Sequence, residues 1–110
     1  MESPREQLRA HSDFNQILSD LLKKSGRYQG GKAARMRIDR ASLEAVEKIE
    51  NLLQRDQYLF DQETKDVWRG AKLRISGVNL AQDIDANLAD MLQTHVRSQI
   101  EKLKQTLNLE

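Results

Sequence analysis

The chain has 110 residues, of which 38% are hydrophobic, and its formal net charge at pH 7 is +1. This length fits one domain with a modest core, and this composition excludes both a disordered polyelectrolyte and a polycation. The absence of cysteine excludes disulfides and thiolate metal sites. No apolar run approaches the roughly 18 residues of a membrane span. We therefore expect a single domain over residues 1–110 that is cytoplasmic and does not contact a membrane.

The first expected helix begins after Ser3 and ends near Lys24. Ser3 has the side chain of an N-cap, Pro4 occupies the first helical position, and Glu6 completes a capping box. Apolar side chains then recur every three or four residues, which is the spacing of a helix with one buried face. Gly26 supplies a residue on which the helix can end, because glycine adopts the left-handed conformation easily.

A basic, glycine-rich loop is expected over residues 25–37. Residues 21–40 contain seven basic side chains and one acidic side chain, which predicts contact with an anionic partner. The same bases could instead pair with the protein's own acidic helix, and the sequence leaves both alternatives open. The predicted contact residues are Arg27, Lys32, Arg35 and Arg37.

The same loop contains Gly26, Gly31 and Lys32 at the spacing of a phosphate-binding loop. Ala33 stands where such a loop needs a hydroxyl side chain to hold magnesium, and the loop follows an expected helix rather than a strand. We therefore predict no nucleotide site and no other cofactor.

Two further helices are expected near residues 40–54 and 62–74. Asp39 can cap the first of these helices and Asp61 the second. Residues 34–38 and 71–75 each alternate apolar and basic side chains, so short strands at these two places are the alternative to a purely helical fold. Trp68, the only tryptophan, is expected to be buried against the C-terminal helix.

The C-terminal helix is predicted over residues 80–107, with Asn79 as its cap. A helix of this length would span about 42 Å, whereas a compact globule of this chain length is roughly 34 Å across. We therefore expect a second copy or a partner helix to cover its free part. The predicted interface is the apolar stripe of its second half, namely Leu92, Val96, Ile100, Leu103 and Leu107.

Few residues suggest a chemical site. His11 and His95 lie on or beside the apolar stripes of their helices, where a partly buried or interface histidine is expected rather than a catalytic base. The oxygen-bearing residues of the C-terminal helix spread over four turns, too far apart to hold one cation. These residues are Asn79, Asp83, Asn87 and Asp90. We predict no enzyme, no metal site and no small-molecule substrate.

The sequence thus predicts an all-α protein, a small bundle of three to four helices with a long C-terminal helix. Its predicted role is a non-enzymatic assembly or adaptor module, which forms a homo-oligomer or binds a partner helix and uses the basic loop on an anionic partner. The alternative is a small DNA-binding protein. A strand at 34–38 followed by helices at 40–54 and 62–74 resembles ribbon-helix-helix repressors. This resemblance implies that Arg35 and Arg37 contact DNA while Met36 and Ile38 face the core.

Overall fold

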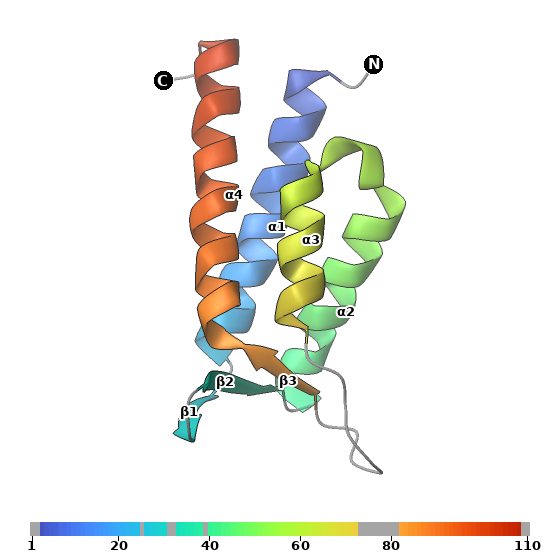
Figure 1. Cartoon of the computed structure of the whole chain (residues 1–110). Helices are drawn as coiled ribbons and strands as arrows, with labels where there is room; N and C mark the ends of the chain where they lie inside the picture. The colour runs from blue at the N-terminus through green and yellow to red at the C-terminus, as the bar shows by residue number, and fades with distance from the viewer. Residues whose placement is uncertain (1–2, 25, 31–32, 39, 73–81, 109–110) are drawn as a thin grey trace.

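The computed structural model describes residues 3–24, 26–30, 33–38, 40–72 and 82–108. Within these residues, four α-helices form a bundle, and three short strands form a sheet at one end of it (Figure 1). The helices are α1 (Pro4–Lys24), α2 (Arg40–Arg55), α3 (Gln62–Ala71) and α4 (Ala86–Leu107), with a 3-10 turn η1 (Gln57–Leu59) after α2. The strands are β1 (Gly26–Gly30), β2 (Ala33–Ile38) and β3 (Gln82–Asp85). The predicted helical bundle with a long C-terminal helix is confirmed.

Helix α1 begins and ends as the sequence predicts. The Oγ of Ser3 accepts a hydrogen bond from the backbone N–H of Glu6 at 3.1 Å, which is the N-cap contact of the predicted capping box. Phe14, Leu18 and Leu21 are fully buried, so the predicted apolar stripe is the buried face of the helix. This face lies against α4, which runs beside α1 along the whole bundle (Figure 1).

The segment predicted as a loop over residues 25–37 is instead a β-hairpin for most of its length. β1 pairs antiparallel with β2, and Tyr28 lies opposite Arg35 in the register. The alternation in residues 34–38 is that of a strand, since Met36 and Ile38 are buried and Arg35 and Arg37, which alternate with them, are exposed. β3 pairs with the other edge of β2 and places the buried Ile84 opposite Met36. β2 is therefore the central strand of the sheet.

Helix α3 begins where it was predicted and ends earlier than predicted. Asp61 is its N-cap, and its carboxylate accepts a hydrogen bond from the backbone N–H of Thr64. The helix ends at Ala71 instead of near position 74, and Lys72 forms an isolated antiparallel bridge with Ile84. The rest of the predicted strand at 71–75 lies outside the described residues, as does the predicted N-cap Asp39.

Helix α4 begins at Ala86 instead of Leu80. The four residues before it form β3, and Asp85 is the N-cap, whose carboxylate accepts a hydrogen bond from the N–H of Leu88 at 3.0 Å. The predicted cap Asn79 lies outside the described residues. The 22 residues of α4 span about 33 Å. The molecule measures 46 × 25 × 22 Å, so α4 fits within its long axis and its length alone does not require a partner.

The core runs through all four helices and the inner face of the sheet. Trp68 is 3% exposed, which agrees with the predicted burial. Its indole nitrogen has no hydrogen-bond partner among the described residues. Trp68 borders a surface groove that it shares with Leu53 and Gln57, so at least part of its surroundings comes from α2 and η1.

Candidate functional site

The described residues include only part of the predicted anion-contact set. Arg35 and Arg37 lie on the exposed face of β2. Arg27 is on β1 and lies opposite Met36 in the register, and Lys32 lies outside the described residues. The four residues are therefore not shown as one contact surface.

Acidic residues of β3 lie directly across from the arginines of β2. The register pairs Arg35 with Asp85 and Arg37 with Asp83, and a guanidinium nitrogen of Arg35 lies 3.6 Å from the Asp83 carboxylate. The acidic helix α2, which the sequence offered as the internal partner, makes other ion pairs. Its Glu44 pairs with Lys48, and its Glu50 pairs with Lys72. Arg35 is thus paired within the sheet, and an acidic residue of β3 also lies opposite Arg37 in the register.

The position of β2 also bears on the resemblance to ribbon-helix-helix repressors. That resemblance implies a paired strand with Met36 and Ile38 toward the core and Arg35 and Arg37 outward, and these side chains are buried and exposed accordingly. Here β1 and β3 of the same chain occupy both edges of β2. In the described part of the chain, β2 is therefore paired with strands of its own chain.

The predicted interface stripe of α4 divides into two parts. Leu92 and Val96 are fully buried and Ile100 is 8% exposed, because the other helices of the same chain already cover them. Leu103 and Leu107 are half-buried and do not belong to the buried core. Only this second part of the predicted interface remains available to a partner.

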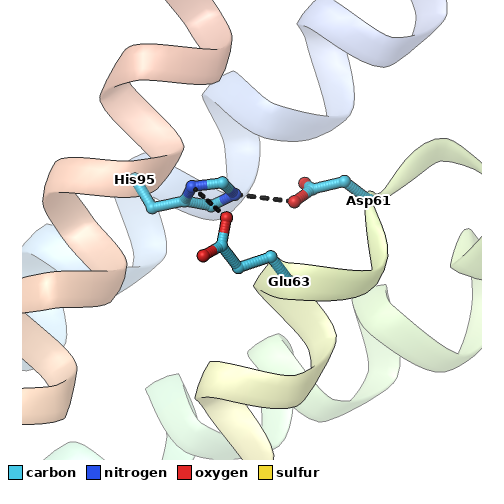
Figure 2. A group of neighbouring side chains, drawn as sticks. All are labelled: Asp61, Glu63 and His95. Atoms are coloured by element: carbon cyan, nitrogen blue, oxygen red, sulfur yellow. Dashed lines mark hydrogen bonds and ion pairs between the residues drawn. The ribbon is translucent and has the colours of Figure 1, made fainter.

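A polar cluster that the sequence did not predict lies where α1, α3 and α4 meet. Its centre is the carboxylate of Asp61, the N-cap of α3. The Nε2 of His95, on α4, lies 2.6 Å from Oδ2 of Asp61, and the Nε2 of His11, on α1, lies 3.4 Å from Oδ1. The Nδ1 of His95 lies 3.0 Å from Oε2 of Glu63, so the imidazole stands between two carboxylates (Figure 2).

Local contacts fix Asp61 and His11, whereas Glu63 is exposed. Asp61 is held by its capping role, because the N–H and the hydroxyl of Thr64 both donate to it. The His11 ring packs against Phe60 at 4.9 Å between centroids, and its Nδ1 lies 2.7 Å from the carbonyl oxygen of Gln7. Glu63 follows two residues after the cap, in the first turn of α3, and its side chain is 67% exposed.

The surroundings of Asp61 favour its ionised form. Burial by itself raises the pKa of this carboxyl group. Hydrogen bonds from the hydroxyl and N–H of Thr64 and from the two imidazoles outweigh that effect, so the pKa of Asp61 lies well below its usual range. Asp61, Glu63 and His95 each offer one metal-ligand atom, and these three atoms lie within 4.8 Å of one another.

The sequence contains signals for the single members of this cluster but not for their meeting. Asp61 is recognisable as a cap, and each histidine sits on or beside an apolar stripe. His95 and His11 are 34 and 50 residues from Asp61 along the chain, so only the packing of α1 and α4 on the start of α3 brings them together.

Comparisons with known proteins give no relative: no protein-family model, curated protein or solved structure matches this chain. Within the described residues, none of the helices combines the length and the apolar character that crossing a membrane requires.

Proposed function

We propose that the protein is a cytoplasmic, non-enzymatic assembly module that binds a second copy of itself through the paired ends of α1 and α4. The observation that carries the proposal is the arrangement at the end of the bundle away from the sheet. There the last turns of α4 and the first turns of α1 extend past α3 (Figure 1). Leu103 and Leu107, on these turns of α4, are half-buried and lie outside the buried core.

A second copy is the occupant that fits this end best. All four helices contribute apolar residues to the buried core. At the end away from the sheet, α1 and α4 extend as a pair past α3 (Figure 1). An identical pair from a second copy, related by a two-fold axis, would complete a four-helix arrangement there. The exposed charges are mixed, with Arg5 and Glu6 on α1 and Glu101 and Lys102 on α4. Both signs are present, as a self-complementary contact requires.

Light scattering tests the proposal directly. The wild-type chain has a monomer mass of 12.7 kDa and should give twice this mass at high micromolar concentration. The double variant Leu103→Glu and Leu107→Glu should give the monomer mass, because two charges would be buried in the contact. Truncation of α4 is less suitable, since it would remove the core residues Val96 and Ile100.

A matched control is available on the same helix. Met91 is 58% exposed and lies in the half of α4 near the sheet, so Met91→Glu should leave the mass unchanged. Circular dichroism must show the same helix content in all three proteins. A wild-type chain that is folded and monomeric at high micromolar concentration would contradict the proposal.

Contact with nucleic acid is a second candidate function, favoured by Arg35 and Arg37 being exposed on the same face of β2. Because Asp83 pairs with Arg35, Asp83→Asn should strengthen binding to duplex DNA at about 50 mM salt. Two phosphate contacts predict a log–log salt dependence with a slope of about −1.8. Asp66→Asn, which removes an acid from α3, is the control. Absence of binding by both wild type and Asp83→Asn would rule this function out.

A further inference from the structure

A neutral imidazole cannot donate a hydrogen bond in both of the carboxylate contacts that His95 makes. Its Nε2 lies 2.6 Å from Asp61 and its Nδ1 lies 3.0 Å from Glu63. A neutral imidazole carries one N–H and one lone pair, and an ionised carboxylate only accepts hydrogen bonds. In one of the two contacts, a nitrogen lone pair therefore faces a carboxylate oxygen lone pair, unless a second proton or a metal ion lies at that nitrogen.

We propose that Asp61, Glu63 and His95 form a site for a divalent cation of the zinc class. One ligand atom from each residue lies within 4.8 Å of the others. Zinc bonds to imidazole nitrogen and carboxylate oxygen are about 2.0–2.2 Å long, which places tetrahedral ligand atoms about 3.3 Å apart. The contact between His95 and Asp61 would open by less than about 1 Å to reach this spacing.

One carboxylate of the cluster can move and the other is held in place, as a metal site of this kind requires. Glu63 is exposed at 67% and carries its carboxylate on a side chain with three rotatable bonds. It can therefore leave the Nδ1 of His95 and move onto an ion held between Asp61 and the Nε2 of His95. Asp61 is fixed, because Thr64 donates to both of its oxygens and His11 contacts Oδ1. Hydrogen bonds that orient a ligating carboxylate in this way are a regular feature of protein metal sites.

The charge and the donor atoms together favour this class of ion. Asp61 and Glu63 contribute two negative charges, which a divalent cation neutralises. Among the described residues, the structure pairs no lysine or arginine with either carboxylate. An imidazole ligand favours zinc and its neighbours in the transition series over magnesium and calcium, which prefer oxygen alone. The exposed side of Glu63 leaves room for water to complete the coordination.

The bound ion would link the first turn of α3 to the middle of α4, so it should stabilise the folded chain. The test uses the full chain without a histidine tag, freed of metal with EDTA and then dialysed. Calorimetric titration with Zn²⁺ should show one ion bound per chain. Thermal unfolding should shift to a higher temperature with Zn²⁺ and not with the same concentration of Mg²⁺.

Variants locate the binding to these side chains. Glu63→Gln removes an exposed carboxylate and should leave the fold intact. It should lower the Zn²⁺ affinity by more than about 100-fold, because loss of an outer-shell partner alone costs up to about that factor. His95→Gln should have the same effect. Asp66→Asn removes a carboxylate one turn further along α3, outside the cluster, and should bind Zn²⁺ like the wild type.

Two results would overturn the proposal. One is the absence of both a binding heat and a thermal shift when Zn²⁺ is added to the wild-type chain. The other is a Zn²⁺ affinity that Glu63→Gln and His95→Gln leave unchanged, because the ion would then bind elsewhere on the chain. The stoichiometry is counted per chain and the thermal shift is compared at one chain concentration, so this test is independent of the assembly proposal.

Discussion

Asp61 connects three helices through one carboxylate. It caps α3, and its two oxygens meet a histidine from α1 and a histidine from α4. A capping carboxylate is usually a local feature, worth about 1 kcal/mol to its own helix. Here the same side chain also contributes to the packing of α3 between its neighbours, so its removal should affect the whole fold.

The depressed pKa of Asp61 predicts a pH-dependent contribution to stability. Its pKa in the folded chain lies below the value of about 3.9 expected in the unfolded chain. The ionised group therefore stabilises the fold above about pH 4, and this stabilisation is lost as the pH falls below that value. Asp61→Asn lacks it at every pH. The difference in unfolding free energy between wild type and Asp61→Asn should be largest near neutral pH and should narrow toward pH 2.

Urea unfolding at a series of pH values, with EDTA present, measures this difference. Asp66→Asn is the matched control, since its carboxylate is 55% exposed in a surface pair with Arg69 and should contribute little at any pH. A difference between wild type and Asp61→Asn that stays constant from pH 7 to pH 2 would show that the charge of Asp61 does not matter.

At the scale of elements, the helices were largely predictable and the strands were only partly so. The stripe and the N-cap of α1 and the N-cap of α3 are local signals, and they hold in the structure. β2 was recognisable by its alternation, but its partner β1 is a glycine-containing segment with the appearance of a loop. Ile84 fits the helical spacing between Leu80 and Leu88 and equally fits a strand. Only its pairing opposite Met36 selects the strand, and a single sequence does not reveal such a pairing.

The beginning of α4 gives a prediction at this scale. Because Asp85 is the N-cap, Asp85→Ala should lower the free energy of unfolding by about 0.5–2 kcal/mol. Asn87 is exposed in the first turn of the same helix, and Asn87→Ala should have little effect or a slightly stabilising one. Urea denaturation of both variants measures the difference. Equal stability of the two variants would mean that Asp85 does not cap the helix.

At the scale of the whole molecule, the length of α4 does not by itself require a partner, contrary to the prediction from the sequence. The prediction compared the length of the helix with the diameter of a nearly spherical globule, whereas the bundle is 46 Å long and about half as wide. Most of the predicted interface stripe is therefore the chain's own core. What remains of the predicted interface is the end of the bundle away from the sheet, where α1 and α4 extend past α3 (Figure 1). Leu103 and Leu107 lie in the last turns of α4. The polar cluster could not be predicted from the sequence, because it depends on how three helices pack against one another.

The most direct test of the assembly proposal is to measure the distance between equivalent points in two copies of the chain. The chain has no cysteine, so one introduced cysteine carries a spin label at one chosen place. Labels at Gln105→Cys, near the end of α4, should lie within about 30 Å of each other, the length of a 20-residue helix. Labels at Glu47→Cys, on the exposed face of α2, should lie farther apart. Absence of coupling between labels at Gln105→Cys, or a shorter distance at Glu47→Cys, would contradict association through the ends of α1 and α4.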